Sequence, residues 1–524
     1  MTAARDVLRG RLGLPELAEL RPGEFAAEVK REQLPAVADQ AAGAGLRLAT
    51  LFATDDGPAK GCALHHLWAA REPPGFVRIW TRVPADSPRF PSIAAKYPVA
   101  NWFEREVMDY FGLVPEGHPN TFRVALHDDW PDGFPALRKA FADEQKVPRV
   151  PGNNPHPFRP VLGEGVFQVP VGPVHAGIIE PGHFRFGVAG EPVLYLQLRL
   201  FYVHKGIEKR FEKLPWRHGL FLAESISGDT AVGHALAYAH AVERLTGVEV
   251  PRRARYLRTV LLELERLYNH VADIGAIATD VAFAVPASRA QVLREGLVAI
   301  QERLFGARLL RGTVALGGVK CELTLGRRNE LLVHLDRLGR EFDDLVKLLI
   351  DSGTFTDRVD GTGVLGTQAA RDLGVVGIAA RASGLDLDLR RDQPHDAYAS
   401  LRFQVPVEEG GDVRARLMVR AREVEQSLSI LRQALEGLPE GPSFTPLPDA
   451  LPASSSALGW AEAWRGECLH WVQTDEEGRV ARVKVTDPSF KNWPGLGRAV
   501  PGNILPDFPV INKSFNLSYS GNDR

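Results

Sequence analysis

Three titratable side chains stand close together in the segment from 172 to 186. His175 and His183 carry imidazoles, which titrate near neutral pH even without a special environment. Glu180 lies between them and supplies a carboxylate. Groups whose pKa values lie near the working pH are suited to general acid–base chemistry. This segment is therefore a candidate for proton exchange.

The neighbours of Glu180 allow two roles for it. Ile178, Ile179 and Pro181 flank it, and a carboxylate buried among apolar side chains has a raised pKa. Under this interpretation Glu180 exchanges protons near neutral pH. The alternative is a structural ion pair with an arginine such as Arg185. The sequence leaves both open.

A second candidate is the turn Ser227-Gly228-Asp229-Thr230, which leads directly into a helical pattern. Gly228 can adopt the dihedrals of a bend, and Asp229 or Thr230 can cap the amides that open a helix. After the turn, one helical face carries His234, Tyr238 and Ala241. The structural interpretation of this stretch is an ordinary capped helix.

The composition is that of a soluble globular protein, with 44% hydrophobic and 24% charged residues. At 524 residues the chain is too long for one compact core, so we expect two or more domains. A net charge of -2 gives no reason to expect nucleic acid. The sequence lacks an apolar run of membrane-spanning length and a secretory signal. We expect a cytoplasmic-type chain that can dock on membrane partners.

The cysteines are too few and too scattered for a thiolate cluster. Cys62, Cys321 and Cys468 lie far apart, and no Cys-x-x-Cys occurs. Four-thiolate clusters and structural zinc sites normally draw on paired cysteines. We therefore expect no metal bound through the chain's own cysteines.

The first 165 residues divide into a small α+β domain and a linker. In residues 1–125, the β-like runs LRLATLFAT and KGCALHHLWAA flank a turn at 55–58, VRIWTRV adds a strand, and NWFEREVMDYFG is helical. Residues 126–165 contain PRVPGNNPHPFRP, whose prolines exclude regular helix and favour a stiff connection.

Residues 166–524 combine strands at both ends with long helices between them. FRF and VLYLQLRL predict a β-hairpin around 189–191. In the middle, RYLRTVLLELERLYNHVADIG carries an apolar stripe at helical spacing, and three more long helical patterns follow, which suggests a helix bundle. WAEAWRGECLHWV and RVARVKV predict a C-terminal hairpin around 475–478. The whole chain is thus expected to be α+β.

Several segments resemble, in order, the large subunits of complex I-like and energy-converting [NiFe] hydrogenase-related complexes. They are GPVHAGIIEPGHFRF, HKGIEK, ELERLYNHVADIG, DRVDGTGVLG, RASGLDLDLR and GDVRARLMVR. The stretch from Glu104 to Pro119 resembles the small hydrophilic docking subunit of complex I, where we expect structural ion pairs rather than catalysis. The chain therefore resembles a fusion of two peripheral-arm subunits, as in formate hydrogenlyase and hydrogenase-4 type large subunits.

The resemblance locates a metal site whose ligands are missing. In [NiFe] hydrogenases two Cys-x-x-Cys bends hold the metal, and the four corresponding positions here are Ser227, Thr230, Ser518 and Gly521. A neutral hydroxyl is a poor ligand for a soft-ligated nickel centre, and glycine offers none. We expect no metal at these bends and no hydrogen activation.

In complex I the same two bends surround a quinone headgroup, held between a histidine and a tyrosine. His175 fits the histidine, whereas Gly228 stands at the tyrosine position, beside Asp229. Glu180 stands where membrane-bound hydrogenases carry a glutamate thought to pass protons. Further groups expected around the cavity are His183, Asp523 and Arg524.

The function implied by the resemblance is that of a peripheral subunit on the cytoplasmic face of the membrane. It would take electrons from a [4Fe-4S] cluster on a small partner subunit toward a quinone or another acceptor, and couple this to ion movement through antiporter-like membrane subunits. The alternative is a redox-inactive scaffold or conformational coupler. No GxGxxG fingerprint opens a βαβ unit, so nicotinamide chemistry would belong to a partner.

Overall fold

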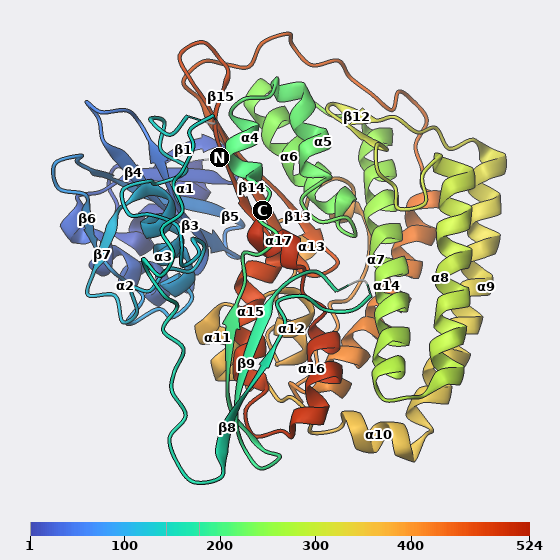
Figure 1. The fold of residues 1–524 in the computed structure, drawn as a ribbon. Helices are drawn as coiled ribbons and strands as arrows, with labels where there is room; N and C mark the ends of the chain where they lie inside the picture. Colours follow the sequence, from blue (N-terminus) through green and yellow to red (C-terminus); the bar gives the residue numbers. More distant parts are fainter. Residues whose placement is uncertain (1, 143, 178) are drawn as a thin grey trace.

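The computed structural model describes residues 2–142, 144–177 and 179–524, and it shows a mixed α+β protein (Figure 1). The N-terminal part is built on a five-stranded sheet of order β1-β2-β5-β4-β3, in which β2 and β5 are parallel and the other neighbours antiparallel. Its strands are β1 (Ala18–Arg21), β2 (Glu24–Glu28), β3 (Arg47–Asp55), β4 (Cys62–Ala70) and β5 (Gly75–Val83). The predicted hairpin around 55–58 is confirmed.

Three helices belong to this part: α1 (Thr2–Leu12), α2 (Leu34–Gly43) and α3 (Ala100–Phe111). A short parallel pair, β6 (Arg89–Pro91) and β7 (Val114–Glu116), and a 3₁₀ turn, η1 (Arg31–Gln33), complete it. The helix α3 ends at Gly112, whose φ of 70° is left-handed and favours glycine. The helix predicted from NWFEREVMDYFG is confirmed.

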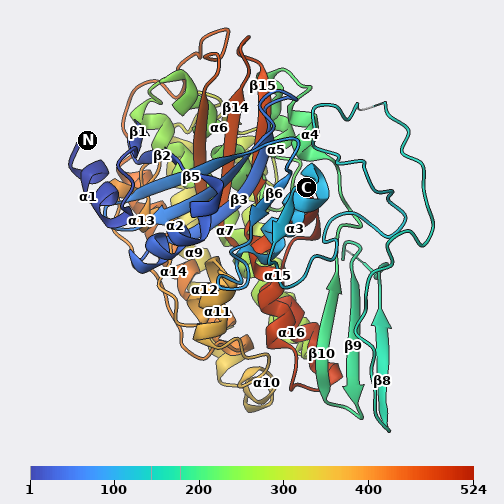
Figure 2. The same ribbon diagram turned by 90° about the vertical axis from the view of Figure 1, so that its left-hand side faces the viewer.

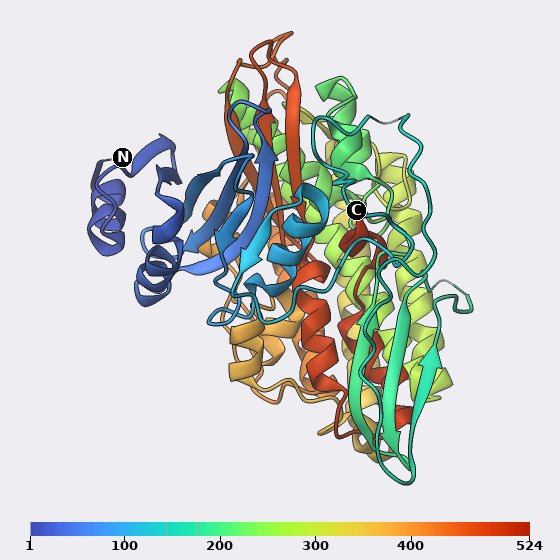
Figure 3. The same ribbon diagram turned by 60° about the vertical axis from the view of Figure 1, so that its left-hand side comes forward.

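One face of the N-terminal sheet packs against a second sheet at the C-terminal end of the chain. That sheet is antiparallel, in the order β13 (Ser456–Ala463), β14 (Gly466–Thr474) and β15 (Val480–Thr486). Phe52 of β3 and Trp471 of β14 are both buried, with ring centroids 4.9 Å apart. Figures 2 and 3 show the two sheets side by side. The two sheets thus share a hydrophobic core.

The C-terminal sheet corrects one prediction. The run WAEAWRGECLHWV was expected to be one strand, but the chain reverses at Trp464 and Arg465 and forms both β13 and β14. Gly466 follows with a φ of 133°, which a side-chain-bearing residue rarely adopts. The tight reversal places the Arg465 side chain at the end of the sheet.

A third sheet projects from the body of the molecule (Figures 2 and 3). It consists of β8 (Val166–Val171), β9 (His183–Ala189) and β10 (Val193–Arg199), all antiparallel in the order β10-β9-β8. The predicted turn around 189–191 joins β9 and β10. Between β7 and β8, the described residues 117–142 and 144–165 form no helix or strand.

The centre of the molecule is a helix bundle, as predicted. Its long members are α7 (Arg252–Asp280), α8 (Ala284–Phe305), α9 (Leu325–Ile350) and α14 (Val413–Glu436) (Figure 1). Before the bundle come α4 (Ile207–Phe211), η2 (Trp216–His218), α5 (Gly219–Ala223) and α6 (Ala231–Thr246). Within and after it lie β11 (Val314–Ala315), β12 (Gly318–Val319), α10 (Gly353–Val359), α11 (Thr367–Leu373), α12 (Gly377–Ala382), α13 (Leu389–Asp392), η3 (Tyr398–Ser400), α15 (Pro488–Ala499), η4 (Leu505–Asp507), α16 (Phe508–Phe515) and α17 (Tyr519–Asp523).

The helix α7 is buried on its polar side as well as along its apolar stripe. His270 and Arg266 lie 2.8 and 3.3 Å from the Glu423 carboxylate of α14, and Asp273 accepts a hydrogen bond from Arg420 at 2.9 Å. Buried charges are tolerated when they are paired and hydrogen-bonded.

None of the described helices has the length and apolarity needed to cross a bilayer.

Candidate functional site

The two bends singled out in the sequence meet in the structure. The first bend, 227–230, leads from α5 to α6, and the second, 516–521, runs from the end of α16 into the first turn of α17. The Oγ atoms of Ser227 and Ser518 are 2.8 Å apart and buried. Because Ser227 donates to Asp229 at 2.8 Å, Ser518 must donate to Ser227, while it accepts the Gly521 N–H at 2.8 Å. We call this arrangement the paired bends.

An arginine from the C-terminal sheet closes the paired bends. Arg465 donates to both carboxylate oxygens of Asp229, at 2.6 and 2.7 Å, and to the Thr230 hydroxyl at 3.1 Å. Its guanidinium lies 3.8 Å from the ring centroid of Trp464. Burial by itself would raise the pKa of Asp229, but Arg465 and the hydroxyls of Ser227 and Thr230 outweigh it and hold the pKa at about 2. Asp229 is therefore ionised at neutral pH.

The cap of α6 differs from the prediction. Neither Asp229 nor Thr230 accepts a hydrogen bond from the first amides of the helix. Instead the buried carboxylate of Glu265, on α7, accepts the N–H groups of Val232 at 2.7 Å and Gly233 at 3.0 Å. Burial raises the pKa of Glu265 to about 8 despite these hydrogen bonds. The side chains of the bend are thereby left to bond with each other and with Arg465.

Two glycines occupy positions where the resemblance implies larger side chains. Gly228 is exposed, has no positive φ, and a Cβ there would meet no atom within 4 Å. At Gly521 a Cβ would lie 2.5 Å from Oδ2 of Asp487. Asp487 is fixed because it contacts His234 at 3.0 Å and caps α15. A cysteine therefore cannot replace Gly521 unless Asp487 moves.

The donor set of the paired bends does not fit a soft-ligated nickel centre. The hydroxyls of Ser227 and Ser518 are bonded to each other, and that of Thr230 is bonded to Asp229 and Arg465. Hydroxyl oxygens are hard, neutral ligands, whereas nickel–iron chemistry depends on thiolates. These positions form a hydrogen-bonded closure between two loops.

Glu180 reaches the second bend, where its Oε2 accepts the Ser520 N–H at 3.0 Å. The expectation of a buried carboxylate is not met, because Glu180 is half-buried and Ile179 is 41% exposed. Ile178, which the same expectation used, lies outside the described residues. The structure thus ties Glu180 to α17 in a partly open position.

The alternative partner of Glu180 is engaged elsewhere. The Arg185 guanidinium carbon lies 3.6 Å from the ring centroid of Phe158, a cation–π contact with the linker. Its Nε has no hydrogen-bond partner in the described part of the chain. The proposed ion pair with Glu180 is therefore not observed.

Of the two candidate histidines, His175 lies in the loop between β8 and β9, and His183 is the first residue of β9. Nε2 of His175 lies 2.8 Å from the Gly182 carbonyl, and Nδ1 of His183 lies 3.3 Å from the Gly172 carbonyl. His183 is buried, and burial lowers its pKa. It lines a cavity of about 510 Å³ that contains no residue of the paired bends. Both histidines thus bond to backbone carbonyls of their own segment, and among the described residues neither makes a hydrogen bond to the paired bends.

The adjacent residues Asp523 and Arg524 point to different partners. Asp523 accepts the amides of Phe201 at 2.9 Å and Val203 at 3.0 Å, and burial raises its pKa to about 6. The Arg524 guanidinium instead donates to Glu106 of α3 at 2.6 Å. Arg524 is thus a buried tie to the N-terminal part rather than a wall of the paired bends.

The charged motif of α3 makes structural contacts, and those of Glu106 are ion pairs of the predicted kind. Glu106 also accepts from Lys484 of β15 at 2.7 Å. Glu104 accepts the Ile93 N–H at 2.8 Å, and burial raises its pKa to about 7. Asp109 accepts the amides of residues 124 and 125 at 2.9 and 2.8 Å. These carboxylates hold loops and join the two parts of the chain.

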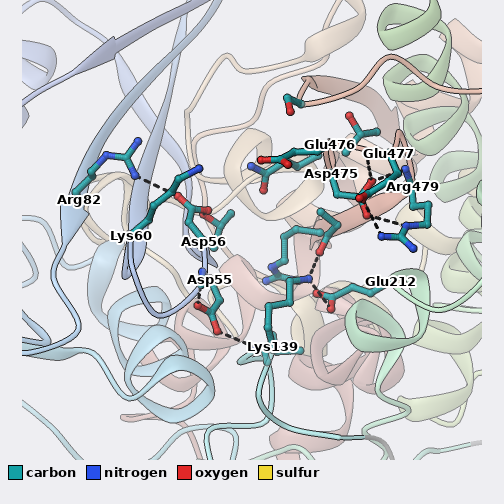
Figure 4. Close-up of a pocket in the computed structure, with 18 residues that line it drawn as sticks. Asp55, Asp56, Lys60, Arg82, Lys139, Glu212, Asp475, Glu476, Glu477 and Arg479 are labelled. Carbon is teal, nitrogen blue, oxygen red and sulfur yellow. Dashed lines mark hydrogen bonds and ion pairs between the residues drawn. The ribbon is translucent and has the colours of Figure 1, made fainter.

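A cavity of about 520 Å³ lies between the β3–β4 turn and the β14–β15 turn (Figure 4). Its charged side chains include three ion pairs: Arg82 with Asp56, Lys139 with Glu212, and Arg479 with Asp475. No residue of the paired bends lines it. We interpret it as an ion-paired seam between the two parts of the chain.

Sequence reasoning missed several residues that contact the paired bends or their supports. They are Trp464, Arg465, Glu265, Asp487 and His470. The one available signal was Arg465-Gly466, an arginine before a glycine inside a strand-like run, which is typical of a tight reversal. The others lie in regular elements or at their ends, and only the fold brings them near.

Comparison with known proteins assigns the family. The model of the respiratory-chain NADH dehydrogenase 30 Kd subunit matches residues 27–147, and that of the 49 Kd subunit matches 273–458 and 449–524. Formate hydrogenlyase subunit 5 of Escherichia coli (strain K12) is 35% identical over 456 residues, which cover 86% of this chain and 79% of that protein. The chain belongs to the family of complex I-like, hydrogenase-related large subunits.

Other family members support the same assignment. Hydrogenase-4 component G of Escherichia coli (strain K12) is 34% identical over 444 residues, covering 84% of this chain and 77% of that protein. The C/D fusion protein of the NADH-quinone oxidoreductase of Cereibacter sphaeroides (strain KD131) is 30% identical over 478 residues, covering 83% and 82%. The predicted fusion of two subunit types is thereby confirmed.

The fold is also shared with a solved structure. A chain of the membrane-bound sulfane sulfur reductase, described as an archaeal respiratory membrane complex, superposes with a TM-score of 0.65 at 27% identity. The match covers 70% of the present chain and all of the reductase chain. The predicted α+β class, with a small N-terminal part before a large-subunit-like part, is confirmed.

Proposed function

We propose that this chain is a peripheral-arm subunit of a membrane-associated, complex I-like oxidoreductase. It takes electrons from a [4Fe-4S] cluster on a small partner subunit and passes them toward a quinone or another acceptor. The electron transfer is coupled to ion translocation by membrane subunits of the antiporter type. The family membership and the names of the relatives support this role.

The observation that carries the redox role is the Asp229–Arg465 ion pair at the meeting point of the two bends. The Asp229 side chain is 40% exposed and stands next to the exposed Gly228, so this carboxylate is reachable from outside, whereas the Arg465 side chain is only 4% exposed. Around it are the hydroxyls of Ser227 and Thr230. A guanidinium and hydroxyls stabilise the negative charge that develops on a carbonyl acceptor during reduction.

Reduction of a quinone to a quinol consumes two electrons and two protons, so it needs proton donors beside the electron route. Asp523, the last residue of α17, has a pKa of about 6 and accepts the amides of Phe201 and Val203, whereas the half-buried Glu180 accepts the Ser520 N–H of α17. A carboxylate whose pKa lies near neutral pH exchanges protons readily. On this ground we assign the proton supply to Asp523, and we add Glu180 because of its partly open position at the second bend. We assign Asp229 to charge positioning because it stays ionised.

The residues that hold the headgroup in the complex I arrangement are not reproduced. The tyrosine position is Gly228, and Nε2 of His175 is bonded to the Gly182 carbonyl. The acceptor therefore has a binding mode of its own, centred on Arg465. The chain has no thiolates at the paired bends, so we do not assign hydrogen activation to it.

The second candidate is a redox-inactive scaffold or conformational coupler. It is favoured by the direct contact between Ser227 and Ser518, which holds the two bends together without any bound group. Under this proposal the paired bends transmit shape changes between partner subunits. The location is the same in both cases: the cytoplasmic face of the membrane, against the small iron–sulfur subunit.

The deciding experiment uses the intact assembly purified from membranes. We expect reduction of a soluble quinone analogue by the reduced assembly, and at least a tenfold loss of this rate in Asp229→Asn. The matched control is Asp475→Asn, a turn residue outside the paired bends. Spectroscopy of the iron–sulfur clusters shows whether electrons arrive. Clusters that become reduced without any turnover of acceptor in the unaltered assembly would exclude the redox role and leave the scaffold.

A further inference from the structure

Three potential metal ligands converge in the core directly behind the paired bends. Nδ1 of His234 lies 3.1 Å from Nε2 of His470 and 3.2 Å from Sγ of Cys468. The ligand atoms of all three residues lie within 4.8 Å of one another. His234 belongs to α6, and the other two belong to β14. All three side chains are fully buried.

The hydrogen bond of His234 to Asp487 determines which ring nitrogen carries the proton and which one presents a lone pair to the cluster. Its Nε2 lies 3.0 Å from Oδ2 of Asp487, so the proton is on Nε2 and donates to the carboxylate. Nδ1 therefore points an unshared electron pair at Cys468 and His470. A carboxylate that orients a histidine in this way is the usual outer partner of a metal-bound imidazole.

The cluster is poorly satisfied by hydrogen bonds alone. The single lone pair of His234 Nδ1 faces two neighbours, the imidazole of His470 and the thiol of Cys468, and can accept well from only one. If His470 donates through Nε2, its Nδ1 is left unprotonated, and this atom has no partner among the described residues. A buried acceptor without a partner costs free energy.

The spacing suits a tetrahedral cation with nitrogen and sulfur ligands. Zinc–nitrogen bonds of about 2.0 Å and zinc–sulfur bonds of about 2.3 Å place neighbouring ligands roughly 3.3–3.6 Å apart. Two of the three separations, 3.1 and 3.2 Å, need to open by only a few tenths of an ångström, and the third, between Cys468 and His470, is within 4.8 Å. One position of the ion remains for a non-protein ligand.

A second cluster, formed by His240, His395 and Asp396, has no free imidazole lone pair directed at its centre. Nδ1 of His240 lies 2.7 Å from the Trp460 carbonyl, and its Nε2 lies 3.0 Å from Asp396. Both ring nitrogens face acceptors, so both carry protons and neither has a lone pair to give. The nearby His395 is different, because its Nε2 accepts the Glu462 N–H and its Nδ1 faces Asp396, so its one lone pair is already engaged. Of these two clusters, the one behind the paired bends is the one that directs a lone pair toward its centre.

We propose that His234, Cys468 and His470 bind one divalent cation of the zinc class, with Asp487 as the outer partner of His234. The ion clamps α6 to β14, and so it fixes the two elements that carry the first bend and Arg465. The site is distinct from the four lost thiolate positions. It needs no Cys-x-x-Cys, because one cysteine and two histidines from distant segments supply the same kind of donor set.

The test is metal analysis of the purified full chain, expressed once in medium with zinc and once with cobalt in its place. We expect about one ion per chain. The cobalt protein should show the intense visible bands of a tetrahedral site and a near-ultraviolet thiolate-to-cobalt band. Cys468→Ser should abolish the thiolate band, whereas Cys321→Ser, which alters another buried cysteine, should leave it unchanged.

Two further variants separate this site from others. Asp487→Asn keeps the three ligands and should weaken the ion's affinity by about 10–100-fold. Ser227→Ala should leave metal content and spectrum unchanged, because it alters only the paired bends. An unaltered chain without stoichiometric metal would overturn the proposal. So would a thiolate band that survives in Cys468→Ser. The metal content of the unaltered chain is measured without any variant, so the proposal stays testable if a variant fails to fold.

Discussion

Ser227 and Ser518, 291 positions apart in the chain, share a buried hydrogen bond of 2.8 Å. We expect Ser227→Ala and Ser518→Ala each to lower the free energy of unfolding by about 1 kcal/mol, since each leaves a buried polar partner unmatched. The double variant should lose less than the sum of the two. Urea denaturation of the four proteins gives the coupling energy. Strict additivity would show that the two hydroxyls are independent in solution.

The buried carboxylate of Glu106 joins α3 to the C-terminal part through Arg524 and Lys484. Both cations also lie near Glu208, at 3.3 Å from Lys484 and 3.5 Å from Arg524, but Arg482 shares that carboxylate. Glu106→Gln therefore leaves three buried cations around one carboxylate, and we expect a loss of about 3–5 kcal/mol in unfolding free energy. The control is Glu116→Gln, whose pair with Arg89 is exposed and should be worth at most about 1 kcal/mol. Equal losses in the two variants would contradict a structural role for the α3 motif.

Glu104 gives a pH dependence whose sign follows from its environment. Burial raises its pKa from 4.5 to about 7 in the folded protein. Between these values the folded state keeps a proton that the unfolded state has lost, so stability falls as pH rises through this window. One such group contributes a slope of up to about 1.4 kcal/mol per pH unit. We expect Glu104→Gln to flatten the decline between pH 4.5 and 7, as measured by denaturation across pH. An unchanged slope would place the folded pKa near the unfolded one.

The two glycines of the bends should respond differently to a methyl group. Gly521→Ala brings a Cβ to 2.5 Å from Asp487, and we expect a loss of about 1–3 kcal/mol from this overpacking. Gly228→Ala meets open space and should change stability by less than about 0.5 kcal/mol. Thermal unfolding compares the two. A tolerated Gly521→Ala would mean that Asp487 yields easily, and that this position could still accept a cysteine.

The long elements were predictable because their signals are local. The apolar stripe of α7 and the turn between β3 and β4 depend on residues close in sequence. The reversal at Arg465 was missed because strand-like residues continue on both sides of it, so the periodicity shows no break. The cap of α6 was also missed, since the acceptor, Glu265, comes from the next helix.

The candidate site was predictable as a place but not as a set of bonds. The family resemblance located both bends, and the structure joins Ser227 to Ser518 and Glu180 to Ser520. The resemblance could not show that the Arg524 side chain points toward Glu106 and away from the bends, because this partner lies 418 positions away in the sequence. Partners of buried charges are set by tertiary packing, which a single sequence does not record.

The packing of Phe52 against Trp471 has a consequence for how the molecule would respond to a protease. The two stretches that separate family models describe, 27–147 and 273–524, are held by this aromatic contact and by the ties of Glu106, in addition to the covalent connection. A single nick in the proline-rich segment should therefore leave two fragments that elute together as a native-like pair. The covalent connection between the two parts would then not be required for them to stay associated.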